Sequence, residues 1–235
     1  MRTLTFILAA LVAVGCRQGP KPDKGMAAVQ VKVIAEPKVG VKPPPEDPAG
    51  KSSYGPFSRV DYSEVDHIVV WVEPVAPGAP PLPAGPINTS VDPQKSSHGL
   101  DGVVCVGQTV VIKNAGQQTQ AIYSASDGND FALTAVPPGG TGEFKVRTAG
   151  LIEIFAESSK DIAVQLYAAP TPWAQIGRAG QTLDFNNIPP GRCRIVSWHH
   201  RLPGTSEVTD LAADKVTQAT ITVGVNSLPK VGSAQ

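Results

Sequence analysis

Short runs of β-branched and aromatic residues, separated by glycine, proline, asparagine and aspartate, follow one another from about residue 65 to residue 224. Runs of this length and spacing are typical of β-sandwiches. The chain also contains 23 glycines and 23 prolines and shows no convincing amphipathic helix. The sequence therefore predicts an all-β fold. The expected strands lie at 65–72, 103–106, 108–113, 119–124, 142–147, 151–156, 162–168, 182–186, 192–198 and 216–224.

The first sixteen residues predict export from the cytoplasm. Arg2 is followed by an uncharged apolar run at 4–14 and then by Gly15-Cys16, which is the pattern of a signal peptide and is too short to span a bilayer. The end of this run resembles the lipobox of bacterial lipoproteins, which implies that Cys16 is the lipidated first residue of the mature chain. Arg17, where an Asp would favour the inner membrane, implies an outer-membrane lipoprotein facing the periplasm or the surface. An ordinary secretory signal is the alternative.

Composition divides the remainder of the chain into segments. The segment after the signal peptide is rich in proline and lysine and almost without aromatic residues, so it is expected to be an extended tether. The alternation of Val29, Val31 and Val33 leaves a short strand open if a partner edge exists. The expected segments are a signal peptide (1–16), a disordered tether (17–61), a first β domain (62–168), a second β module (169–225) packed against it, and a flexible tail (226–235).

Several motifs in the two β segments carry a resemblance to a known family. They are Gly107-Gln-Thr-Val-Val-Ile-Lys-Asn114, Tyr123-Ser124, Phe131-x-Leu133, Pro137-Pro138-Gly139, Gly150-Leu-Ile-Glu-Ile-Phe155, Pro189-Pro190-Gly191 and Trp198-His199. Over about 65–224 the chain resembles the cupredoxin-like methylamine utilization proteins, which join a plastocyanin-type domain to a carboxypeptidase-regulatory-like, transthyretin-like module. The resemblance implies a cupredoxin-like Greek-key β-sandwich followed by a small sandwich with a carbohydrate-binding-like fold.

The resemblance also implies where copper would bind, and those positions hold other residues. The family has a His six residues after an Asn, where this chain has Gln120. The family's Cys-x-x-His-x-x-Met loop corresponds to Ala156, Ser159 and Ile162. A blue-copper site needs two imidazoles and a thiolate with a weak axial thioether, and one amide oxygen cannot replace them. We therefore predict four vacated ligand positions, no bound metal and no cofactor.

Other histidines keep an alternative open. His98, Cys105 and the pair His199-His200 are the residues from which a copper site could be rebuilt, which would make the protein an electron-transfer cupredoxin. Neighbouring residues of one strand point to opposite faces, so His199 and His200 cannot easily chelate the same ion. We interpret His67 as a surface or hydrogen-bonded side chain.

The two cysteines that remain after Cys16 lie in apolar, strand-like runs. An oxidising compartment would permit a disulfide between Cys105 and Cys193. We favour two separate buried thiols that behave as small apolar side chains, because both neighbourhoods are β-branched and apolar.

Tryptophans support a third interpretation. Trp173 and Trp198, together with His199 and Arg201, form a candidate binding surface, since exposed indoles stack on sugar rings. This makes a carbohydrate-binding envelope lipoprotein a further alternative, against core packing of the same indoles. Trp71 is expected in the core, because its strand is apolar on both faces.

Charge and motifs exclude other classes of protein. With 20 basic and 20 acidic residues the chain has no basic field that would attract nucleic acid. It contains no Gly-x-Ser-x-Gly, His-Glu-x-x-His, P-loop or Cys-x-x-Cys motif. We predict a non-enzymatic envelope protein that is attached to the membrane through Cys16 and has an unidentified envelope protein or glycan as its partner.

Overall fold

A computed structural model describes residues 19–37, 39, 61–75 and 85–227, and it confirms the all-β fold. These residues form fifteen strands and one 3₁₀ turn at Val225–Ser227. The strands are β1 (Ala27–Glu36), β2 (Ile68–Pro74), β3 (Ile87–Val91), β4 (Gly102–Cys105), β5 (Thr109–Asn114), β6 (Gln120–Ser124), β7 (Phe131–Val136), β8 (Thr141–Lys145), β9 (Gly150–Ala156), β10 (Ile162–Ala169), β11 (Ala174–Gly177), β12 (Thr182–Ile188), β13 (Gly191–Trp198), β14 (Ser206–Leu211) and β15 (Val216–Gly224).

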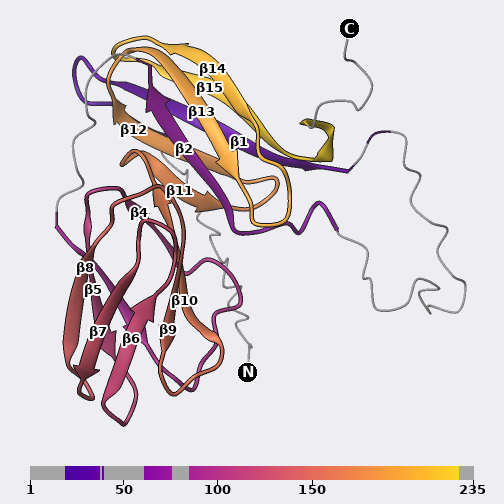
Figure 1. Cartoon of the computed structure of the whole chain (residues 1–235). Coiled ribbons are helices and arrows are strands. Elements are labelled where there is room, and N and C mark those ends of the chain that lie inside the picture. The colour runs from indigo at the N-terminus through magenta and orange to yellow at the C-terminus, as the bar shows by residue number, and fades with distance from the viewer. Residues whose placement is uncertain (1–18, 38, 40–60, 76–84, 228–235) are drawn as a thin grey trace, which may run out of the picture.

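The strands build two sandwiches (Figure 1). In the first, which we call the terminal sandwich, the sheet β12-β1-β15 faces the sheet β11-β2-β13-β14 across a core that draws residues from both layers. In the second, the inserted sandwich, the sheet β3-β5-β8 faces the sheet β4-β10-β9-β6-β7 across a separate core. The chain leaves the terminal sandwich after β2, completes the whole inserted sandwich, and returns at β11.

This connectivity corrects the domain boundaries that the sequence predicts. Strand β2 lies in the predicted first domain (62–168), yet it pairs with β11 and β13 of the terminal sandwich. The inserted sandwich therefore begins at β3 rather than near residue 62, and the second module is completed by strands that precede the first domain in the sequence. Runs that are neighbours along the chain usually share a domain, but the pairing partners of β2, strands β11 and β13, lie about a hundred residues later in the sequence.

Strand β1 corrects the predicted tether. Residues 27–36 pair antiparallel with β12 and parallel with β15, so they form the middle strand of a sheet. The alternating side chains of Val29, Val31 and Val33 are all buried in the core of the terminal sandwich. The proline-rich composition of 17–61, averaged over the whole segment, concealed this period-two pattern. Residues 40–60 of the predicted tether and the tail from 228 lie outside the described residues.

Each predicted strand run corresponds to a strand of the structure. Besides β1, four strands are present that the sequence did not predict. The missed strands β3, β7, β11 and β14 are the outermost strands of their sheets. Exposed polar side chains in β3 and β14, and the exposed Ala132, Thr134 and Ala135 of β7, weaken the apolar alternation that reveals a half-buried strand. Their pairing comes from backbone hydrogen bonds to a neighbouring strand, which leave no mark in the composition.

The two sandwiches meet on the outer face of β2. Val69 and Trp71 point away from the core of the terminal sandwich and pack with Tyr167 of β10 in a third apolar cluster. The ring of Tyr167 lies between two indoles, 5.7 Å from that of Trp71 and 4.6 Å from that of Trp198 between centroids. Glu73 holds Trp71 in place, because its carboxylate accepts a hydrogen bond of 2.6 Å from the indole N–H. Both faces of β2 are therefore buried, as its doubly apolar sequence predicts.

The position of β1 gives a first testable prediction. Val31→Ala should lower the free energy of unfolding by about 2 kcal/mol, because two buried methyl groups are lost and a cavity remains. The matched control is Lys32→Ala on the exposed face of the same strand, for which we expect a change within about 0.5 kcal/mol. Urea unfolding followed by tryptophan fluorescence measures both variants. Equal stability of the two variants would mean that this segment does not belong to the fold.

Candidate functional site

The four positions at which the family resemblance implies copper ligands lie together at one end of the inserted sandwich. Gln120 opens β6, Ala156 closes β9, Ile162 opens β10, and Ser159 lies in the turn between β9 and β10. Strand pairing places them side by side, since Ala156 is paired with Ile122 and Ile162 with Phe155. This end is remote from the terminal sandwich, because β10 contacts that sandwich only through its later residues (Figure 1).

The side chains at these positions support the polypeptide turn. Gln120 is buried, and its Oε1 accepts a hydrogen bond of 3.2 Å from the backbone N–H of Ser158. The Ser159 hydroxyl accepts a hydrogen bond of 3.2 Å from the backbone N–H of Asp161. Ala156 is fully buried, and Ile162 is apolar. The side-chain oxygen of Gln120 is thus already used to hold the β9–β10 connection.

The residues considered for a rebuilt metal site are distributed over different environments. His98 is exposed in the loop between β3 and β4, whereas Cys105 is buried at the end of β4. Burial raises the pKa of the Cys105 thiol and so favours its protonated form, which is a poor metal ligand. His199 and His200 follow β13 in the other sandwich. Among the residues that the structure describes, no group of three or more His, Cys, Asp and Glu side chains is placed to hold a metal ion.

Both cysteines of the described part of the chain are free and buried. Cys193 lies in the core of the terminal sandwich, and burial raises the pKa of its thiol. The preferred interpretation, two separate thiols acting as small apolar side chains, is confirmed, and the alternative of a disulfide is wrong. Cys16 lies outside the described residues.

His199 caps the turn that follows β13. Its Nδ1 accepts hydrogen bonds from the backbone N–H groups of Arg201 (3.2 Å) and Leu202 (3.1 Å), so this nitrogen carries no proton. The ring lies 4.5 Å from the ring of His200 between centroids. Burial first, and then the neighbouring His200, lower the pKa of His199 to about 4, although Asp66 acts in the opposite direction. His199 is therefore neutral in any near-neutral medium.

His67 links the two sandwiches at the same end of β13. It immediately precedes β2 and has a positive φ of 52°. Its Nδ1 lies 3.2 Å from the carbonyl oxygen of Leu100, which belongs to the loop before β4 of the inserted sandwich. The ring covers Gly99 so closely that a Cβ built there would lie 2.6 Å from Nε2. The interpretation of His67 as a hydrogen-bonded side chain is confirmed, but its role at the junction had no signal in the sequence.

The tryptophans are engaged in packing. Trp71 is buried, Trp173 packs against the core of the terminal sandwich, and Trp198 stacks on Tyr167 at the junction. Among the described aromatic residues, Tyr123 is the one with a largely exposed side chain, at 39%. It stacks at 5.6 Å on Phe155 of β9, so this pair forms an aromatic patch on the outer face of the inserted sandwich. Arg201 is exposed beside His199 and Trp198.

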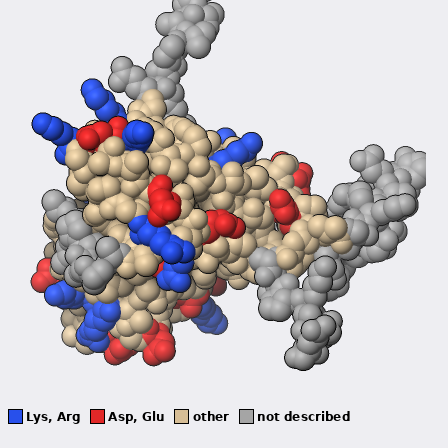
Figure 2. Space-filling model, turned by 90° about the horizontal axis from the view of Figure 1, so that it is seen from above, with Lys and Arg blue, Asp and Glu red and all other residues tan. Residues whose placement is uncertain are grey.

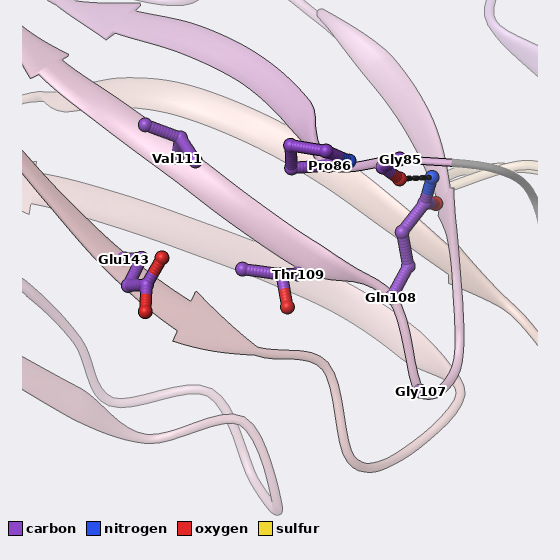
Figure 3. A pocket seen from close by; sticks show the side chains of 7 residues that line it. All are labelled: Gly85, Pro86, Gly107, Gln108, Thr109, Val111 and Glu143. Carbon is purple, nitrogen blue, oxygen red and sulfur yellow. Dashed lines mark hydrogen bonds between the residues drawn. The ribbon is translucent and has the colours of Figure 1, made fainter.

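A pocket of about 390 Å³ lies on the outer face of β5 and β8 (Figure 3). Thr109 and Val111 of β5 and Glu143 of β8 line its floor. At its rim the side-chain amide of Gln108 donates a hydrogen bond of 3.2 Å to the carbonyl oxygen of Gly85. These residues do not pair a nucleophile with a general base. The sequence carries no signal for this pocket, since Thr and Glu on an exposed strand face are ordinary surface residues.

Gln108 also borders a smaller cavity of about 180 Å³ between the two sandwiches. Its Oε1 accepts a hydrogen bond of 3.0 Å from the backbone N–H of Cys105. Thr171 and Pro172, which connect β10 to β11, close the cavity from the other side. The buried Thr171 hydroxyl donates a hydrogen bond of 2.8 Å to the carbonyl oxygen of Val72. The cavity is thus a gap at a fixed junction, with its polar groups hydrogen-bonded.

One face of the molecule carries both signs of charge in close mixture (Figure 2). Figure 2 shows basic and acidic side chains interspersed over the face that it presents, without an extended field of one sign. Such a surface gives little attraction to a polyanion. Within the described residues, no helix is long and apolar enough to cross a membrane. Comparison of the sequence with protein-family models and with curated proteins gives no match.

The cap formed by His199 predicts a pH-dependent stability. Because its folded pKa of about 4 lies below the ordinary value of 6.5, the unfolded chain takes up a proton between these values while the folded protein does not. The free energy of unfolding should therefore fall as the pH is lowered through this range. His199→Asn retains an acceptor near the Nδ1 position and cannot titrate, so it should reduce this loss.

The measurement is urea unfolding at a series of pH values, with His98→Asn, at an exposed histidine, as the matched control. The role of the cap would be contradicted if the free energy of unfolding of His199→Asn fell with decreasing pH as steeply as that of the wild type. It would also be contradicted if His98→Asn reduced this pH dependence by the same amount.

Proposed function

We propose that this protein is a non-enzymatic lipoprotein of the bacterial cell envelope, anchored through Cys16 and placed at the outer membrane. In this proposal the inserted sandwich is a cupredoxin-like domain that lacks its copper ligands. The two sandwiches together form a binding or structural module, whose partner is an envelope protein or a glycan.

One observation carries the proposal. Gln120, Ala156, Ser159 and Ile162 are the positions at which the family resemblance implies copper ligands, and they lie together around the ends of three adjoining strands. Gln120 is remote in the sequence from the other three positions, which share the β9–β10 connection, and the fold brings it beside them. The side chains present there are an amide that is already hydrogen-bonded, a methyl group, a hydroxyl and an aliphatic chain. They lack the imidazole and thiolate donors of a blue-copper centre.

The other sites give no specific support to catalysis. The Nδ1 of His199 is occupied by two backbone donors, so it is not available as a base. The pocket lined by Thr109 and Glu143 holds no histidine or cysteine. A sugar-stacking role for Trp173 or Trp198 has weak support, because both indoles pack against the protein. The exposed residues beside them, above all Arg201, fit a polar contact surface better than a stacking platform.

Restoring the missing ligands tests the proposal. We expect wild-type protein to take up no stoichiometric copper. The variant Gln120→His, Ala156→Cys, Ser159→His, Ile162→Met should bind one copper ion and acquire the intense visible absorption of a copper–thiolate bond. Metal analysis after gel filtration and the absorption spectrum measure both. A second variant that carries only Gln120→His and Ser159→His separates the need for the thiolate from simple histidine binding.

Tight one-to-one copper uptake by the wild type would overturn the proposal. A variant whose circular dichroism and melting temperature match the wild type, yet which binds no copper, would equally contradict the assignment of these four positions. His98→Ala in the wild-type background controls for copper held at the exposed histidine.

A further inference from the structure

The chain that leads into β1 is fixed to the body of the terminal sandwich. The backbone N–H of Asp23 donates to Oδ1 of Asn187 at 2.8 Å, and Nδ2 of Asn187 donates to the Asp23 carboxylate at 2.8 Å. Two residues later, the backbone N–H of Gly25 donates to the carboxylate of Asp214 at 2.7 Å. The backbone N–H of Asp214 in turn donates to the carbonyl oxygen of Met26 at 2.7 Å. This segment is therefore held through the side chain of Asp23 and through its backbone at residues 23, 25 and 26.

The two partner residues are built for this contact. Asn187 lies just before the β12–β13 turn and Asp214 in the β14–β15 turn, with φ values of 55° and 60°. Residues other than glycine rarely adopt this left-handed conformation, and Asn and Asp are the most tolerant of it. In both cases the side chain meets residues 23–26. Two turns that are distant in the sequence thus clamp the same short segment.

Asp23, the first clamped residue, lies seven positions after Cys16, the proposed lipidation site. Seven extended residues span at most roughly 25 Å. The folded part therefore begins close to the proposed anchor at Cys16. A tether reaching to residue 61 would allow several times this distance between Cys16 and the first folded residue. The length of chain before the clamp limits where the body of the protein can lie.

We infer that the end of the terminal sandwich formed by residues 19–26, the β12–β13 turn and the β14–β15 turn faces the lipid bilayer and lies within about 25 Å of it. This inference rests on the proposed lipid anchor. Three exposed lysines belong to this end, Lys21, Lys24 and Lys215. The nearby acids Asp23 and Asp214 use their carboxylates to bind the clamp. The lysine ammonium groups suit contact with anionic lipid headgroups.

The orientation also fixes what faces away from the membrane. Strand β13 runs from Gly191, beside the clamped end, to Trp198 at the opposite end of the sandwich. Eight strand residues span roughly 25 Å. Arg201 lies exposed at the far end, beside the half-buried Trp198 and His199, where its guanidinium is open to a partner in the surrounding compartment. The anchor and the candidate contact surface occupy opposite ends of one sandwich.

Fluorescence quenching in vesicles tests the inference on the full lipidated chain. The vesicles contain phosphatidylcholine and phosphatidylglycerol, with a fraction of nitroxide-labelled headgroups. A fluorophore is attached at Lys215→Cys on the inferred membrane side, or at Ser206→Cys, an exposed position at the opposite end that serves as the matched control. Cys105 and Cys193 are buried and so protected from labelling. We expect quenching at 215 to exceed that at 206 several-fold.

A spacer variant tests the role of the short connection. Insertion of about twenty Gly and Ser residues between Cys16 and Gly19 introduces a flexible tether that lets the sandwich move away from the bilayer. Quenching of the fluorophore at position 215 should then fall toward that at position 206. Equal quenching at the two positions in the protein without the spacer, or stronger quenching at 206, would overturn the inference.

Mass spectrometry of the same preparations separates this outcome from a failure of the proposed function. An acylated Cys16 with equal quenching at both positions would contradict the orientation alone. An unmodified Cys16 would overturn the proposed lipoprotein, and the orientation with it.

Discussion

The hydrogen bonds that β1 makes with β12 on one side and β15 on the other hold together the three-stranded sheet β12-β1-β15 of the terminal sandwich. Three valines of β1 fill the centre of the core against which β2 and β13 pack. The outer faces of those same strands carry Trp71 and Trp198, which enclose Tyr167 of the inserted sandwich. Removal of β1 would therefore expose the core and loosen the platform on which the second sandwich stands.

The order of the strands explains why the two sandwiches form one body. The inserted sandwich is joined to the terminal sandwich at two points in the chain, after β2 and before β11, so it cannot swing on a single linker. His67, just before β2, adds a hydrogen bond to the carbonyl oxygen of Leu100 in the inserted sandwich. Thr171, in the connection before β11, adds one to the carbonyl oxygen of Val72 in β2. Gln120, Ala156, Ser159 and Ile162 then lie at one extremity of this body, with the clamped N-terminal segment on the other sandwich.

The sequence was sufficient for features that depend on local pattern. The runs around Val111 and Ile154 form strands because β-branched residues recur between turn residues. The four positions that the family resemblance implies as ligand sites, counted from Asn114 and Phe155, lie together in the structure. The sequence was insufficient where partners are remote. The valines of β1 found their partners more than 150 residues later, and the clamp between Asp23 and Asn187 spans a similar interval. Local composition carries no record of such pairings.

Hydrogen exchange followed by mass spectrometry tests most directly whether β1 belongs to the fold. Peptides that cover Val29 to Ile34 should exchange as slowly as those from β13, because their amides are hydrogen-bonded in the middle of a sheet and open only with the whole sandwich. Exchange of these amides at the rate of an unstructured chain, with β13 still protected, would contradict the closed terminal sandwich and the fixed N-terminal segment that depends on it.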